Sequence, residues 1–229
     1  MEYDGTEYAA EHHLTVPRFG MSQEGNEAAI VAALATAHRA TERAGAPLTY
    51  LELGIYQCGT LMGVCRVLEQ LPGPARVIGL DTGDHQVRPA PWFAGMYSPL
   101  AGTGSTPVPE RKVRAWLHWD DRRALLSGGV LGGETFHAVL IDGCHCAACC
   151  RADFLAVEPR VAPGGVVLFH DASPLCDGAP QGNWHGAMRI EVRPVLRELG
   201  LLENERPGWR LLADLTHVPF GMVIVQKRV

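Results

Sequence analysis

Two short stretches late in the chain place acids and imidazoles close together. Asp142 and His145 follow one apolar run, and His170 and Asp171 follow another. Each run is typical of a buried strand. Carboxylates together with imidazoles suit a divalent metal ion or general acid–base chemistry. The alternative is that Asp142 and Asp171 only cap the turns or helices that come next.

An earlier turn combines a carboxylate with glycines. Glu52 lies near the end of an apolar run, and Gly54 and Gly59 follow it. The glycines permit a tight turn and a close approach of the backbone to a ligand. Their spacing does not match the G-x-G-x-x-G dinucleotide fingerprint, and Glu52 would repel a pyrophosphate. The pattern therefore favours a ligand with a positive group, with an ordinary strand-to-helix turn as the alternative.

Two further acids follow later strands. Asp81 comes about 29 residues after Glu52, and an acid at such a position accepts hydrogen bonds from both hydroxyls of a ribose. A solvated loop acid is the alternative for Asp81. Asp120 suits an adenine amino group or the N-cap of the next helix.

These acids need a sheet whose strands end on one side. Apolar periodicity predicts strands over Leu48–Leu53, Arg76–Leu80, Val113–His118, Ala138–Asp142, Gly164–Phe169, Leu211–Leu215 and Val218–Val225. It predicts helices over roughly 27–44, Thr60–Leu71, Asp120–Leu126, Cys146–Val157 and Ala187–Leu199, with Pro194 kinking or starting the last. This alternation indicates an α/β fold. We expect a Rossmann-like, doubly wound, mostly parallel seven-stranded sheet, with an antiparallel strand at or near one edge and helices on both faces.

The 229 residues suit one domain. Within it we expect residues 1–45 to form an N-terminal cap segment. Residues 82–110 are rich in Gly and Pro and contain aromatic side chains. Such a long segment is typical of a lid or substrate loop, and a disordered insertion is the alternative.

Taken together, the motifs resemble the class I S-adenosylmethionine-dependent methyltransferases. Within them the chain is similar to the small-molecule O-methyltransferase branch that includes macrocin O-methyltransferase and cephalosporin hydroxylase relatives. The resemblance covers about residues 48–175. It is carried by Glu52–Thr60, Gly79–Asp81, Ile141–His145 and Pro163–Asp171.

The resemblance implies a role for each matching position. Residues facing the methionine moiety, ribose and adenine of the cofactor would be Glu52, Gly54, Tyr56, Gly59, Thr60, Asp81, Asp120 and Asp142. The metal-binding positions would be Asp142, His170 and Asp171, and the catalytic pair would be His145, as base, with Asp142.

Two positions depart from the branch. Cys58 stands where glycine is usual, which adds a Cβ beside the cofactor. His170 stands where an acid is frequent, which makes the ligand set softer. Magnesium is the first expectation for the metal, and a transition ion is the alternative.

The implied reaction is methyl transfer from S-adenosylmethionine to a hydroxyl of a small-molecule acceptor in natural-product biosynthesis. A metal would lower the pKa of the acceptor oxygens, and His145 would take the proton. One alternative is a metal-binding accessory or hydroxylase-type protein without methyl transfer. A nicotinamide-dependent reductase is disfavoured by Glu52 and the glycine spacing.

Composition and charge limit the classes of partner and the location that we expect for this protein. The net charge of −5 argues against nucleic acid, and no apolar run approaches the ~20 residues of a membrane span. The acidic N-terminus lacks an apolar signal core, so we expect a cytoplasmic protein. Self-association into a homo-oligomer is compatible with the sequence.

Four of the seven cysteines crowd into Cys144, Cys146, Cys149 and Cys150. A zinc site is one interpretation. The spacing lacks the paired knuckles of most zinc sites, so small thiols packing inward from a helix are favoured. Cys144 is the exception, because it lies between Asp142 and His145 and is expected at the rim of the sheet.

Overall fold

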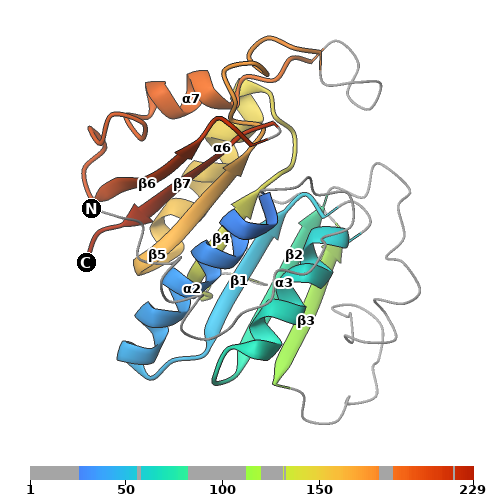
Figure 1. The fold of residues 1–229 in the computed structure, drawn as a ribbon, viewed down its shortest axis with the longest axis vertical. Helices are drawn as coiled ribbons and strands as arrows, with labels where there is room; N and C mark the ends of the chain where they lie inside the picture. Colours follow the sequence, from blue (N-terminus) through green and yellow to red (C-terminus); the bar gives the residue numbers. More distant parts are fainter. Residues whose placement is uncertain are drawn as a thin grey trace.

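The computed structural model describes residues 26–55, 58–81, 112–119, 131, 133–180, 188–218 and 220–229. Its strands form one sheet in the order β3-β2-β1-β4-β5-β7-β6 (Figure 1). The strands are β1 (Leu48–Leu53), β2 (Ala75–Asp81), β3 (Val113–Trp119), β4 (Phe136–Ile141), β5 (Val161–His170), β6 (Trp209–Leu215) and β7 (Met222–Lys227). The helices are α2 (Asn26–Ala44), α3 (Gly59–Gln70), α6 (Ala147–Val157) and α7 (Val192–Glu198), with a 3₁₀ turn, η1 (Glu158–Arg160), after α6.

Strand direction confirms the predicted sheet. Neighbouring strands from β3 through β2, β1 and β4 to β5 pair in parallel, whereas β7 is antiparallel to both β5 and β6. The antiparallel strand is therefore next to the edge strand β6. Because five adjacent strands run the same way, their carboxyl ends meet along one edge, the upper edge in Figure 1.

Helices cover both faces of the sheet, and alternate side chains of β1 pack into the core on each face. Leu48 and Tyr50 belong to the core under α2 and α3, whereas Leu51 and Leu53 belong to the core under α6 and α7. Successive side chains of a strand point to opposite faces. A strand covered on both sides therefore shows an almost continuous apolar run. By the same alternation, Glu52 points to the α2 and α3 side.

The predicted helix faces are confirmed where periodicity is strong. The expected inner face of α2, at Ile30, Ala33, Leu34 and Ala37, is buried, as are the predicted inner positions of α3.

The prediction of a helix from Ala187 is wrong for the residues described, because α7 begins only at Val192. Arg189 instead forms an isolated bridge with Pro180. Pro194 thus lies in the first turn of α7, where its missing N–H has no intrahelical partner to lose.

The strand predicted from Val218 is also wrong at its start, since β7 begins at Met222. Phe220 and Gly221 both have positive φ, 62° and 73°, and they turn the chain before β7.

Several expectations lie outside the described residues: the first 25 residues of the cap segment, the segment 82–110 and the helix at Asp120–Leu126. Among the described helices, none combines the length and apolar character needed to cross a membrane.

Candidate functional site

The turns after β1 and β4 lie against each other, and a glycine makes this possible. The Asp142 N–H donates to the Leu53 carbonyl over 2.9 Å, and the Gly54 N–H donates to the Leu80 carbonyl over 2.8 Å. Gly54 has φ +89°, and a Cβ there would lie 2.2 Å from the Asp142 carbonyl oxygen. Any side chain at position 54 would push the two turns apart. The glycine fixes where Glu52 and Asp142 lie relative to each other.

Glu52 is a carboxyl group buried near the end of β1. It is 1% exposed, and the Tyr50 hydroxyl donates to its Oε2 over 2.9 Å. Burial raises the pKa of Glu52 well above its usual value; the Tyr50 hydrogen bond lowers it, and the Asp142 and Asp81 carboxylates raise it further. Three carboxyl groups thus act on one another at the ends of β1, β2 and β4. A cation entering among them would favour the ionised form of Glu52.

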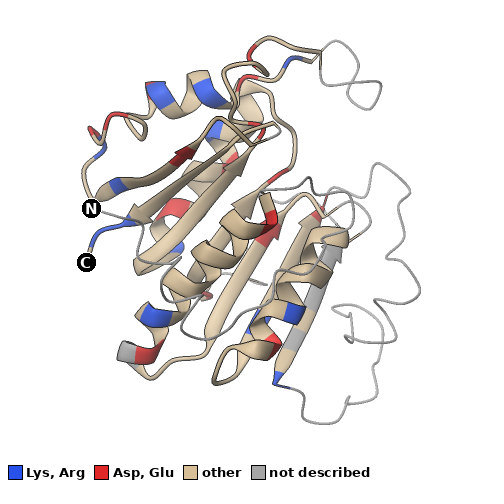
Figure 2. Cartoon of the chain, viewed as in Figure 1, with Lys and Arg blue, Asp and Glu red and all other residues tan. Residues whose placement is uncertain are grey.

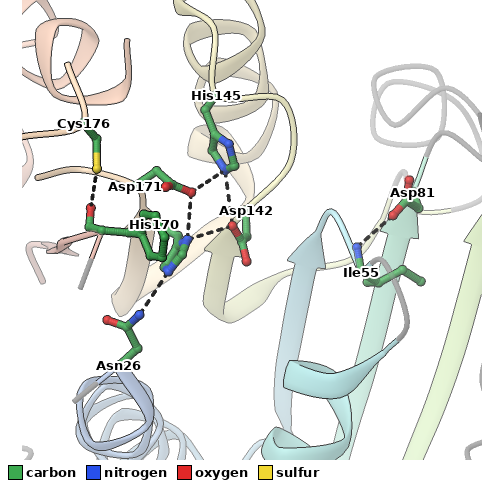
Figure 3. Close-up of polar contacts among 9 residues, drawn as sticks. Asn26, Ile55, Asp81, Asp142, His145, His170, Asp171 and Cys176 are labelled. Carbon is green, nitrogen blue, oxygen red and sulfur yellow. Dashed lines mark hydrogen bonds and ion pairs between the residues drawn. The ribbon is translucent and has the colours of Figure 1, made fainter. Parts of the chain in front are cut away.

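Asp81 fastens the turn after β1 to the end of β2. Its Oδ2 accepts a hydrogen bond from the Ile55 N–H over 3.0 Å (Figure 3). Gly59 and Thr60, also predicted to face the cofactor, are the first two residues of α3. The two remaining predicted cofactor residues, Tyr56 and Asp120, lie outside the described part of the chain.

Cys58 precedes α3 in a left-handed conformation, with φ 63° and ψ 20°. Glycine adopts this conformation without strain, whereas an L side chain does not. This accounts physically for the glycine that the resemblance leads one to expect there. Cys58 is fully buried, and burial, followed by Glu52 and Asp81, raises the pKa of its thiol to about 12. The thiol therefore stays protonated at neutral pH.

Asp142, His145, His170 and Asp171 form a ring of alternating acids and imidazoles (Figure 3). His145 Nε2 lies 3.2 Å from Asp142 Oδ1 and 3.1 Å from Asp171 Oδ2. His170 Nδ1 lies 3.1 Å from the same Asp142 oxygen and 2.9 Å from the same Asp171 oxygen. The structure thus brings together all four residues that the sequence singled out at the ends of β4 and β5. We call them the acid–imidazole ring.

Backbone geometry aims Asp171 into this ring. Asp171 follows β5 directly and has φ 55°, a left-handed conformation that aspartate tolerates better than most residues. The next residue, Ala172, is held by Arg193, whose Nη1 donates to the Ala172 carbonyl over 3.1 Å. Arg193 also makes a two-pronged ion pair with Asp214, at 2.8 and 2.6 Å. The position of Asp171 is therefore supported from α7 and β6.

The ring is strongly polarised. Burial alone would raise the pKa of Asp142, but His170 and His145 outweigh it and hold that pKa well below its usual range. Burial alone would lower the pKa of His170, but the Asp142 and Asp171 carboxylates raise it well above its usual value. In the absence of another cation, His170 is therefore protonated and compensates the carboxylates.

Asn26 is a site residue that sequence reasoning missed. Its Nδ2 lies 3.0 Å from His170 Nε2, although the two residues are 144 positions apart. From sequence alone, an asparagine at the start of a helix indicates only an N-cap. A side-chain amide can donate to an unprotonated imidazole nitrogen or accept from a protonated one. Asn26 is therefore placed to support either protonation state of His170.

The donor set of the ring fits a divalent metal ion. Two carboxylate oxygens and two imidazole nitrogens lie within 4.8 Å of one another. Mg²⁺ prefers oxygen ligands, whereas imidazole suits transition ions such as Zn²⁺, Mn²⁺ or Fe²⁺. The two histidines therefore shift the expected preference from magnesium towards a transition metal.

Comparison with known protein families matches residues 51–172 to a family described as a methyltransferase domain. The matched segment spans more than half of the chain. The chain belongs to this methyltransferase family. No curated protein sequence matches it.

Solved structures share the fold of this methyltransferase. An O-methyltransferase from Bacillus cereus in complex with SAH is 14% identical, with a TM-score of 0.58 over 98% of this chain and 89% of that one. TomG from Streptomyces achromogenes, an O-methyltransferase involved in tomaymycin synthesis and bound to SAM, is 16% identical, with a TM-score of 0.52 over 99% and 88%. MycE from the mycinamycin biosynthetic pathway, in complex with Mg, SAH and mycinamycin VI, is 18% identical, with a TM-score of 0.51 over 99% and 54%. At these identities the likeness shows the class I S-adenosylmethionine-dependent methyltransferase fold, and the predicted fold is confirmed.

The cysteines of the methyltransferase correct one expectation. None of the seven forms a disulfide, and Cys150 is buried as predicted. Inward packing is wrong for Cys146 and Cys149, which are partly exposed, as is Cys144, which was expected at the rim. Cys146 is the N-cap of α6, with Cys144 in the preceding loop and Cys149 in the first turn. That placement leaves the three thiols at the rim of the sheet.

Proposed function

We propose that this methyltransferase moves a methyl group from S-adenosylmethionine to a hydroxyl of a small-molecule acceptor, assisted by a divalent metal ion. The observation that carries the proposal is the acid–imidazole ring beside the Glu52 turn, at the carboxyl ends of adjacent strands. Ligands of doubly wound sheets bind at this edge. Asp142 links the two parts, because it belongs to the ring and also acts on Glu52.

The charge at this edge supports a cationic methyl donor. Figure 2 shows acidic residues at the carboxyl ends of β1, β2 and β4. Glu52 and Asp142 would face the methionine moiety, and Asp81 would bind the ribose. A sulfonium among these carboxylates gains Coulomb energy, whereas a pyrophosphate would be repelled. Tyr56, Gly59, Thr60 and Asp120 complete the cofactor contacts in this proposal.

The difficult part of this reaction is the activation of the acceptor hydroxyl as a nucleophile. The sulfur leaves as a neutral thioether, so no acid is needed there. An alcohol is a poor nucleophile until it loses its proton. A metal bound by Asp142, His170 and Asp171 would supply the Lewis acidity that lowers the pKa of the acceptor hydroxyl.

His145 is the proposed general base. Its Nε2 lies 3.2 Å from Asp142 and 3.1 Å from Asp171, so the two carboxylates orient the imidazole. A positioned base of this kind contributes about 10²–10⁴-fold to the rate. Alignment of the acceptor oxygen with the methyl group would supply much of the remaining acceleration.

A natural-product acceptor is part of the proposal. It is supported by the fold shared with TomG and MycE, whose descriptions connect them with tomaymycin and mycinamycin synthesis. The proposed ligand set also contains an imidazole, that of His170. We therefore propose Mn²⁺, Fe²⁺ or Zn²⁺ ahead of the Mg²⁺ present with MycE.

The test is a screen of hydroxylated metabolites with S-adenosylmethionine and each divalent ion, read as a mass gain of one methyl group. We expect product with at least one metal, loss of product with chelator, and loss in His145→Ala but not in the exposed-histidine control His217→Ala. Binding of S-adenosylmethionine without product from any acceptor would favour the accessory or hydroxylase-type alternative. Full turnover in chelator would remove the metal from the mechanism.

A further inference from the structure

A second cluster of metal-binding atoms lies beside the acid–imidazole ring and has no part in the proposed reaction. The Sγ atoms of Cys144, Cys146 and Cys149 all lie within 4.8 Å of one another. The Cys144 and Cys146 sulfurs are 3.4 Å apart. The thioether of Met188 adds a fourth sulfur, with its Sδ 3.7 Å from Cys144 Sγ.

These separations suit ligands that share one ion. Three thiolates bound tetrahedrally at about 2.3 Å from Zn²⁺ stand about 3.8 Å apart. The sulfurs therefore need only small side-chain adjustments to meet at one centre. A disulfide would need an S–S distance of about 2.05 Å, well below the distance between Cys144 and Cys146.

The partial exposure of these three cysteines also differs from the burial expected of cysteines that only pack in a core. A cysteine that packs as a small apolar group is usually buried. Cys150, the next residue in α6, behaves that way, whereas Cys144, Cys146 and Cys149 remain partly exposed. The trio gathers at the N-terminal end of α6, where Cys146 is the N-cap and Cys149 lies in the first turn.

We infer that Cys144, Cys146 and Cys149 bind a thiophilic d¹⁰ metal ion, Zn²⁺ or Cu⁺, with Met188 as a neighbouring thioether. Each thiol that binds releases its proton to solvent. Thiolate and thioether sulfurs prefer these soft ions, whereas carboxylates accept harder ones. The sulfur site is therefore chemically distinct from the acid–imidazole ring, although the loop after β4 contributes residues to both.

Cu⁺, with Met188 as an additional ligand, would join two segments that already touch. The Glu191 N–H donates to the His145 carbonyl over 2.8 Å, and the Ala147 N–H donates to Glu191 Oε2 over 3.1 Å. Met188 lies on the same segment as Glu191 and reaches Cys144. The ion would thus stabilise the loop that presents Asp142 and His145, in a structural role.

The experiment titrates the reduced, metal-free full chain with Co²⁺ and follows thiolate-to-cobalt charge-transfer absorption. We expect absorption that saturates at one thiolate-bound equivalent and disappears when Zn²⁺ is added. It should be lost in the double variant Cys146→Ser/Cys149→Ser. It should persist in Asp171→Asn, which alters only the ring, and in Cys176→Ser, which alters a cysteine outside the trio. For Cu⁺, Met188→Leu should weaken binding while leaving Zn²⁺ affinity unchanged.

A second measurement needs no substitution and so does not depend on a variant folding. The native protein is alkylated with and without Zn²⁺, and mass spectrometry identifies the cysteines that Zn²⁺ protects. Protection of Cys144, Cys146 and Cys149 together supports the site. Absence of the charge-transfer band, its persistence in the double variant, or alkylation of the three thiols unaffected by Zn²⁺ would overturn the inference.

Discussion

Replacing Glu52 with glutamine tests whether this edge of the sheet selects a positively charged sulfur. The side chain is 1% exposed and receives the Tyr50 hydroxyl at 2.9 Å. Glutamine keeps nearly the same shape and retains an oxygen that can accept this hydrogen bond. The substitution therefore removes the capacity for negative charge with little change in packing.

The magnitude follows from Coulomb's law. At an effective dielectric constant of about 20, two unit charges attract by about 4 kcal/mol at about 4 Å and by about 2 kcal/mol at about 8 Å. Ionising Glu52 has a cost, because burial, together with Asp142 and Asp81, raises its pKa. We therefore take the lower figure, about 2 kcal/mol, which corresponds to about 30-fold in affinity.

The assay is calorimetric titration of the native protein and Glu52→Gln with S-adenosylmethionine and with its demethylated product, S-adenosylhomocysteine. The two ligands differ in the sulfonium charge, so their affinity ratio isolates it. We expect Glu52→Gln to weaken the sulfonium ligand about 30-fold more than the thioether. Glu69→Gln, which removes an exposed acid at the other end of α3, should leave the ratio unchanged. Equal weakening of both ligands, or no weakening, would refute the assignment of Glu52 to the sulfonium.

The same substitution has a signature in stability against pH. Because the folded-state pKa of Glu52 is raised, the folded chain keeps a proton that the unfolded chain loses. The stability contributed by this group is complete below the unfolded pKa of about 4.3 and is lost as pH rises through the folded value. Glu52→Gln should therefore gain stability relative to the native ligand-free protein as pH rises above about 4.3. Denaturant unfolding at a series of pH values measures this gain, and parallel profiles for the two proteins would contradict it.

Four further outcomes follow from particular contacts. Asp171→Asn, which tolerates the left-handed backbone, should lower kcat/KM by about 100-fold as the metal is lost, with the exposed acid variant Asp177→Asn unchanged. Asn26→Leu should weaken metal binding by about 10- to 100-fold, because it deletes the partner of His170 Nε2; competition with a chromophoric chelator measures this. At position 58, Gly should be more stable than Ala by about 1 kcal/mol in denaturant unfolding, the reverse of their order in ordinary helices, because φ is 63°. Phe154→Ala should cost about 3–5 kcal/mol in the same assay, since Phe154 is fully buried with its ring 5.6 Å from that of Phe169 and 5.4 Å from that of Trp209.

Sequence reasoning succeeded where one local pattern decides the structure. Apolar runs followed by acids located the ends of β1, β2, β4 and β5, because a strand buried on both faces has to be apolar until it reaches the edge. Parallel order then brought Asp142, His145, His170 and Asp171 together. The same logic placed Glu52, since its side chain continues the alternation of Leu48 and Tyr50.

It failed where contacts are distant or depend on backbone detail. Asn26 contacts His170 although 144 positions separate them in the sequence, and no local sequence pattern predicts that contact. The partial exposure of Cys146 and Cys149 depends on where α6 begins and how it sits on the sheet. The late start of α7 depends on the pairing of Arg189 with Pro180, which propensity cannot anticipate.

The two candidate metal sites change how any chelator experiment must be interpreted. The loop after β4 contributes residues to both sites, so a chelator would inactivate the enzyme even if only the sulfur site were occupied in the cell. Loss of the structural ion would loosen Asp142 and His145 together and reduce activity without any metal at the reacting oxygen. The variants separate these cases, because Asp171→Asn should lower kcat at unchanged melting temperature. Cys149→Ser should lower the melting temperature and remove its dependence on Zn²⁺. A chelator effect that vanishes in Cys149→Ser but persists in Asp171→Asn would assign the metal requirement to the fold and leave the proton transfer to His145 alone.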